Sequence, residues 1–107
     1  GGSDWPVIPL PNPWLGIEGL ITRADPDGLF PGTLWVEQAL TLDEAIAVYT
    51  TASSKAMGLA DTTGSLEPGK SADFIVLDRN PWQIAVTDLA DVQVLETWFA
   101  GEQVFVR

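Results

Sequence analysis

Hydrophobic and polar positions change their spacing about two thirds of the way along the chain. Between Leu42 and Met57, apolar or small residues recur every three or four positions, as on one face of a helix. After Gly64 they form short continuous runs instead, within 72–78 and 92–106, which is typical of strands. The pattern therefore predicts helices followed by a sheet, an order that indicates the α+β class.

The central helix is expected over about 42–57. Thr41 and Glu44 fit the T-x-x-E capping box, which predicts a helix beginning at the next residue. Gly58 is placed to end it. Residues 50–54 include four Thr or Ser, whose hydroxyls compete for backbone groups, so a break into two pieces is expected there.

An earlier helix is expected over about 13–23. Asn12 followed by Pro13 is a helix-start signal, with the amide as N-cap and proline at the first helical position. The residues that we expect to face the core are Leu15, Gly19 and either Ile21 or Leu20.

Three antiparallel strands are expected over about 73–78, 92–99 and 103–106. The last two are joined at Ala100-Gly101-Glu102, where glycine suits a tight hairpin turn. The chain thus divides into a mainly helical part, 1–63, and a strand-rich part, 64–107.

Composition limits the partners. With 107 residues, 46% of them hydrophobic, the chain is long enough for one small domain with a core. Fifteen acidic against five basic residues give a net charge of −10, which disfavours nucleic acid and anionic membranes as partners. The apolar runs are too short to span a membrane.

Two residue types are missing. There is no Cys, which rules out disulfides and thiolate chemistry and leads us to expect a cytoplasmic location. The start has no basic region followed by an apolar one, so no signal peptide is expected there. There is also no His, which removes imidazole general bases, Ser-His-Asp catalysis and the usual zinc ligand sets.

The stretch "GSLEPGKS", residues 64–71, fits the phosphate-loop pattern G-x-x-x-x-G-K-[ST]. A phosphate loop needs a strand before it and a helix after it, whereas here a helix end precedes and a strand follows. Glu67 adds a negative charge, and Pro68 removes a backbone N–H. We therefore predict a turn at Pro68-Gly69, a solvated Lys70 and no nucleotide partner.

Two further charged groups have ordinary explanations. Asp25 and Asp27 in "DPDG" suggest calcium, but a calcium loop needs more oxygen ligands and a distal bidentate Glu, so a turn is the better interpretation. Arg23 could pair with a substrate carboxylate. The preferred alternative is that the positive charge of Arg23 is stabilised by the helix dipole at the C-terminal end of the first helix.

Four segments, in this order, resemble proteins of the amidohydrolase superfamily. They are "GSDWPV" (2–7), "TLDEAIAVYTTASSKAMGL" (41–59), "GSLEPGKSADFIVLD" (64–78) and "VLETWFAGEQVF" (94–105). The first, together with "NPWLGIEGLITR", is most similar to the subgroup called amidohydrolase family three.

The resemblance implies the C-terminal tail of a TIM-type barrel and half of a composite β-subdomain. Residues 1–63 would be the end of barrel strand eight and the last barrel helices, and 64–107 would be subdomain strands. Asp4 matches the strand-eight aspartate that contacts a divalent metal, with zinc the expected ion, and acts as general base. Trp5 would line the substrate pocket. The alternative for Asp4 is an ordinary aspartate that caps the Trp5-Pro6 turn.

The sequence departs from the family pattern because it lacks the other seven barrel strands and every His. One carboxylate does not hold a catalytic zinc, which takes three protein ligands. We therefore expect a C-terminal fragment without a cofactor of its own, beginning at a residue other than Met. Its parent would hydrolyse non-peptide C–N bonds, and its partner would be the rest of the barrel.

The alternative is a non-catalytic module. A divided β-subdomain leaves strand edges and apolar faces uncovered, and such surfaces favour association. This interpretation predicts a homo-oligomer.

Overall fold

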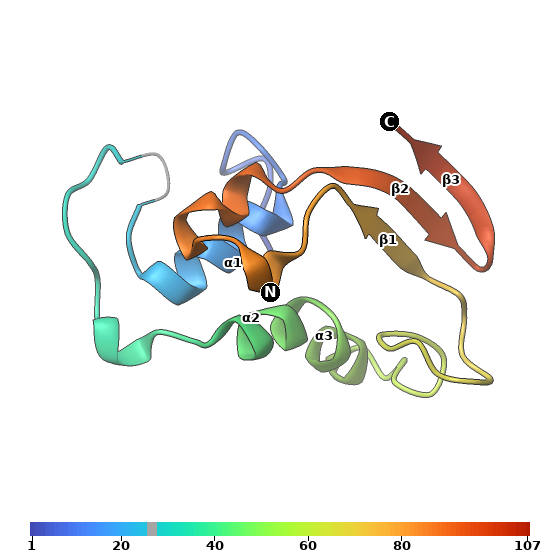
Figure 1. Ribbon diagram of the computed structural model, residues 1–107. Helices are drawn as coiled ribbons and strands as arrows, with labels where there is room; N and C mark the ends of the chain where they lie inside the picture. The colour runs from blue at the N-terminus through green and yellow to red at the C-terminus, as the bar shows by residue number, and fades with distance from the viewer. Residues whose placement is uncertain (26–27) are drawn as a thin grey trace.

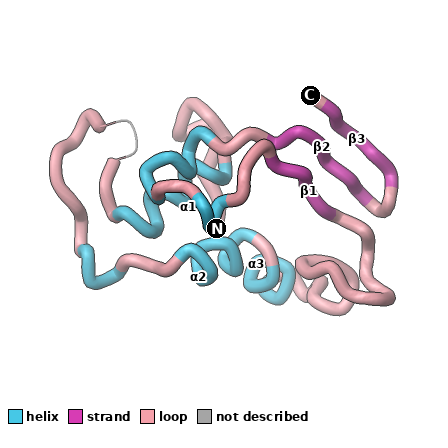
Figure 2. Tube along the Cα trace, viewed as in Figure 1, coloured by secondary structure: helices cyan, strands magenta, loops and turns pink. Residues whose placement is uncertain are grey.

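The computed structural model describes residues 1–25 and 28–107, and its helices and strands occupy different ends of the molecule (Figures 1 and 2). The helices are α1 (Pro13–Thr22), α2 (Leu42–Tyr49) and α3 (Thr51–Ala56), with short 3-10 helices η1 (Val36–Gln38), η2 (Pro81–Gln83) and η3 (Val86–Asp91). The strands are β1 (Phe74–Leu77), β2 (Val94–Phe99) and β3 (Glu102–Val106). The predicted α+β class is confirmed.

Both predicted helix starts are confirmed. The Asn12 side chain accepts a hydrogen bond of 3.0 Å from the Trp14 N–H, which caps α1. At α2, the Thr41 N–H donates to Glu44 Oε2 at 2.8 Å and the Glu44 N–H donates to Thr41 Oγ1 at 3.3 Å. Each bond satisfies a backbone donor that the first turn of a helix leaves without a partner.

The central helix breaks at Thr50, as the hydroxyl-rich stretch predicts. Thr50 has φ −123° and ψ −96°, which is not helical. Its hydroxyl donates to the Ile46 carbonyl at 2.8 Å, and the Ser53 hydroxyl donates to the Val48 carbonyl at 2.6 Å. The side chains therefore satisfy carbonyls at the junction between α2 and α3.

The three strands form one antiparallel sheet in the order β1-β2-β3. Each predicted strand is present, with ends that differ by no more than two residues from the expected ranges. The β2–β3 hairpin turns at Ala100 and Gly101, with φ 51° and 80°. Two successive positive φ values match the right-handed twist of a hairpin.

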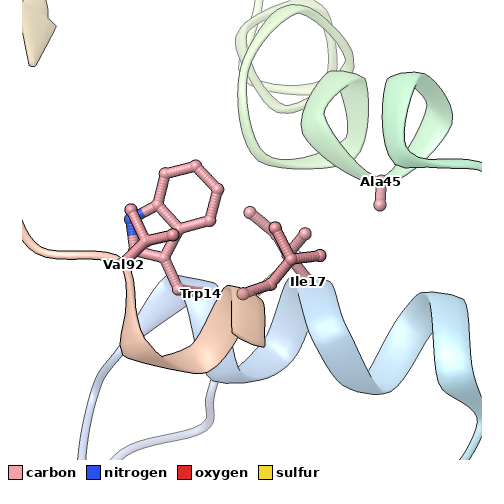
Figure 3. Close-up of a cluster of buried hydrophobic side chains, with 5 residues drawn as sticks. Trp14, Ile17, Ala45 and Val92 are labelled. Carbon is pink, nitrogen blue, oxygen red and sulfur yellow. The ribbon is translucent and has the colours of Figure 1, made fainter. Parts of the chain in front are cut away.

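The core lies between α1, α2 and η3. Its buried apolar residues are Trp14, Ile17, Ala45, Leu89 and Val92, four of which are labelled in Figure 3. Leu20 and Ile21 pack against this cluster, as expected. The expectation for Leu15 and Gly19 is wrong, because α1 turns the face with Trp14 and Ile17 toward the core instead.

The side chains of the α1 N-cap, Asn12, and of Glu18 in α1 also bind the backbone of η3. Asn12 Nδ2 donates to the Ala90 carbonyl at 3.2 Å, and Glu18 Oε2 accepts from the Ala90 N–H at 2.9 Å. Glu18 is buried, and this bond gives its carboxylate a partner there. The sequence reading did not find Glu18, although its position four residues after Trp14 places it on the same face.

The molecule is extended for its size. Its radius of gyration is 14.7 Å, whereas a compact domain of this length has about 13 Å. Its accessible surface is 7454 Å², whereas a folded monomer of this mass exposes about 5,800 Å². The molecule therefore leaves uncovered roughly 1,600 Å² that a compact monomer of this mass would bury. Among the described residues, every helix is too short or too polar to cross a bilayer.

Candidate functional site

Asp4 lies in an exposed turn before α1. It has φ 53°, in the left-handed region that a non-glycine residue rarely occupies. The Trp5 N–H donates to Ser3 Oγ at 3.2 Å, and the Val7 N–H donates to the Asp4 carbonyl at 2.9 Å. The backbone on both sides of Asp4 is therefore hydrogen-bonded, and its carboxylate is open to solvent. The described residues before α1 form no strand, so its place at the end of a barrel strand stays a prediction.

The residues around Asp4 do not make a complete metal site. Within 1–25 and 28–107, no three His, Cys, Asp or Glu side chains come together in a way that could hold a metal ion. A catalytic zinc takes three protein ligands. The role of Asp4 as a metal ligand therefore stays a prediction, and the described residues do not gather three such ligands at any one place.

Trp5 is exposed and follows Asp4 directly, so the structure leaves it available to line a pocket without forming one. A cleft with a volume of about 590 Å³ lies elsewhere, beside the C-terminal end of α1. Its lining residues are Leu20, Arg23, Trp35, Glu37, Gln38 and Leu40.

Arg23 ends α1 in the left-handed conformation, with φ 55°. Its N–H donates to the Gly19 carbonyl at 3.0 Å, and its Nε donates to the Leu34 carbonyl at 3.0 Å. The guanidinium therefore fastens the loop that leaves the helix. Arg23 thus lies at the C-terminal end of α1, as expected, whereas a favourable interaction of its charge with the helix dipole stays a prediction.

The stretch 64–71 is a turn that leads into β1, as predicted, and no helix follows it. Gly69 has φ 93°, which suits the second position of the Pro68-Gly69 turn. Lys70 Nζ donates to Ser65 Oγ at 2.8 Å and to Glu67 Oε1 at 3.1 Å. The Ser65 bond and the Lys70 contact lower the pKa of the Glu67 carboxyl. Lys70 therefore forms an ion pair with Glu67 within its own loop, whereas the sequence predicted a solvated side chain.

Asp73 joins three segments beside this turn. Its carboxylate accepts hydrogen bonds from Thr63 Oγ1 at 2.7 Å, Ser71 Oγ at 2.7 Å and the Ala100 N–H at 2.8 Å. The Ala100 bond, followed by the two hydroxyl bonds, holds the pKa of this carboxyl below its usual value. Sequence reasoning placed residue 73 in a strand and missed this role; its position beside Ser71, before an apolar run, was the available signal.

Asp25 has the turn role that the sequence favoured. Its Oδ2 accepts from the Leu29 N–H at 2.8 Å and from the Phe30 N–H at 3.1 Å. Asp27, the other aspartate of the calcium alternative, lies outside the described residues.

Comparison with known proteins matches residues 1–105 to the amidohydrolase family. The protein LONG AFTER FAR-RED 3 of Arabidopsis thaliana is 32% identical over 105 residues, which cover 97% of this chain and 17% of that protein. N-substituted formamide deformylase of Arthrobacter pascens is 42% identical over 65 residues, which cover 61% of this chain and 12% of the enzyme.

A solved amidohydrolase from Thermotoga maritima superposes with a TM-score of 0.68 at 25% identity, over 97% of this chain and 22% of its own. The chain therefore spans less than a quarter of the length of each of these relatives. Because the family match covers nearly every residue and the fold agrees with a solved member, the chain belongs to the amidohydrolase family.

Proposed function

We propose that this chain is the C-terminal segment of a metal-dependent amidohydrolase that hydrolyses non-peptide C–N bonds, and that it is catalytically incomplete alone. The observation that carries the proposal is its surface of 7454 Å², roughly 1,600 Å² more than a monomer of this mass exposes. The remainder of a TIM-type barrel and of the β-subdomain would cover that surface. The chain matches only 17% of the Arabidopsis protein and 22% of the Thermotoga amidohydrolase, which supports the proposal that it is a segment of a longer enzyme.

Asp4 has the catalytic role in this proposal. In the complete enzyme its carboxylate accepts a proton from the attacking water and returns it to the leaving nitrogen. A divalent metal, with zinc the expected ion, would lower the pKa of water and polarise the carbonyl. Asp4 would be one of its ligands, and Trp5 would border the substrate.

The test uses the complete protein, expressed from the reading frame that contains these residues. The upstream part should encode a His-x-His pair, and an upstream part without one contradicts the proposal. N-formyl amines are the first substrates to assay, because one relative is named a deformylase of N-substituted formamides.

Asp4→Asn should lower kcat by a factor of about 10² to 10⁴. Asp61→Asn changes an exposed aspartate and is the matched control, which should keep activity within about twofold. Tight zinc binding and turnover by residues 1–107 alone would contradict catalytic incompleteness.

We propose self-association of the isolated chain as a second function, favoured by its exposed large apolar side chains. They occur on the loop before α2, where Leu29, Phe30 and Trp35 are exposed, and on the sheet, where Phe99 and Val104 are exposed. Burial of apolar surface drives association. A monodisperse monomer in light scattering would contradict this function and leave the hydrolase proposal untouched.

A further inference from the structure

One side of the sheet carries large apolar side chains from all three strands. Pairing places Ile75 opposite Thr97 and Thr97 opposite Phe105, so these residues share a side. Phe99, two positions from Thr97 along β2, lies on the same side because side chains alternate along a strand. Leu95 has no partner in β1, where the register shifts, but it continues the regular pairing with β3 through the Arg107 N–H, which places it on the side of Phe105. We call Ile75, Leu95, Phe99 and Phe105 the apolar face.

The apolar face is open to solvent. Its members are 46% (Ile75), 36% (Leu95), 65% (Phe99) and 46% (Phe105) exposed. The opposite side of the sheet has contacts of its own. There the rings of Phe74 and Trp98 stack at 5.5 Å, and Glu96 Oε2 accepts from Trp98 Nε1 and Gln103 Nε2. Val76 and Val106 on that opposite side are also exposed, so what distinguishes the apolar face is its two phenylalanines, Phe99 and Phe105.

The apolar face ends in opposite charges. Glu102 pairs with Phe99 at the hairpin end, which places it on this side. The Arg107 N–H donates to the Leu95 carbonyl at 2.9 Å, so the β2–β3 ladder continues and Arg107 lies on this side at the other end. Among the described residues, the ion pairs are Lys70–Glu67 and Arg79–Asp78, and neither end charge takes part.

The apolar face is part of a surface that exceeds that of a typical monomer by roughly 1,600 Å² over the whole molecule. A standard complex buries roughly 800 Å² on each partner. A second copy supplies both an apolar face and the complementary pattern of end charges.

We propose that the apolar face is covered by the same face of a second copy, with two sheets stacked about a two-fold axis. This inference rests on the self-association proposed above. An axis that lies between the sheets and runs across the strands places β3 antiparallel over the partner's β3. Glu102 of each copy then lies opposite Arg107 of the other, and Phe99 packs over the other copy's Leu95. Face-to-face packing of aligned sheets is a standard way to bury apolar faces, and an isologous contact closes at two copies.

The first experiment measures the mass of the 107-residue chain by light scattering after size exclusion, at 20 to 100 µM. We expect a dimer. Phe99→Asp places a charge in the interface and should give a folded monomer, checked by circular dichroism. Leu66→Asp is the control, because Leu66 is also an exposed apolar residue but lies in the turn 64–71, outside the sheet, and it should remain dimeric.

The second experiment exchanges the end charges. Glu102→Arg and Arg107→Glu should each raise the dissociation constant of the dimer about tenfold. Each variant places like charges opposite each other at both of the contacts that the two-fold axis relates. The double variant restores opposite charges and should recover the wild-type dissociation constant.

A wild-type monomer at 100 µM overturns the proposal. So does a dimer that Phe99→Asp leaves intact, or a double exchange that is weaker than either single one. None of these results bears on hydrolysis by the complete protein, which the Asp4 variants test separately.

Discussion

At the scale of single residues, Gly64 shows how backbone conformation and space act together. It has φ 97°, and a Cβ at this position would lie 2.5 Å from the Cβ of Ser54. Ser54 is buried, and its hydroxyl donates to the Thr63 carbonyl at 2.8 Å, so it has no room to retreat. Gly69 has nearly the same conformation, φ 93°, with nothing within 4 Å of its Cβ position.

The two glycines allow a matched comparison. Gly69→Ala should lower the free energy of unfolding by about 1–2 kcal/mol, the cost of the left-handed backbone alone. Gly64→Ala should cost a further ~1–3 kcal/mol, because the added methyl group overpacks against Ser54. Urea unfolding followed by circular dichroism measures both. Equal losses would mean that Ser54 moves aside at no cost.

At the scale of elements, Asp73 ties the loop after α3 and the start of β1 to the β2–β3 hairpin. Its folded-state pKa is depressed, first by the Ala100 N–H and then by the Ser71 and Thr63 hydroxyls. A depressed carboxyl pKa stabilises the folded state fully above the unfolded value, near 4. That contribution is lost as the pH falls below about 4 and through the folded pKa.

Asp73→Asn should therefore lower the melting temperature at pH 7, and the difference from wild type should shrink steadily below pH 4. Melting curves from pH 2 to pH 7 measure this. Asp61→Asn, at an exposed position in the same loop, should show no such difference at any pH. A constant difference between wild type and Asp73→Asn would contradict the role of the ionised carboxylate.

At the scale of the whole molecule, a small core coexists with a large uncovered surface. The apolar cluster lies among α1, α2 and η3, and the sheet extends to one side of it (Figure 1). The chain spans less than a quarter of the length of each relative compared above. Its stability should therefore depend on what covers the rest of it.

We expect the melting temperature of the isolated chain to rise with protein concentration, because association stabilises the folded form by mass action. Scans at 5 µM and 200 µM measure the effect. Phe99→Asp should melt at one temperature regardless of concentration. A wild-type melting temperature that does not change with concentration would contradict association of the folded state.

The sequence alone determined the local structure of this protein. Capping at Asn12 and Thr41, the break at Thr50 and the Ala100-Gly101 turn depend on neighbouring residues, so local rules were sufficient to predict them. The same holds for the turn in "GSLEPGKS", whose flanking segments distinguish it from a phosphate loop. The family also followed from short segments in a fixed order. The roles of Asp4 and Trp5 stay predictions.

Tertiary structure decided which sides of these elements are covered. Neither the inward face of α1 nor the burial of Glu18 follows from spacing, because each depends on where η3 lies, more than sixty residues later. The three bonds to Asp73 likewise join segments distant in sequence. The open apolar face appears only once strand register is known, since a shift of one residue would exchange the two sides of a strand.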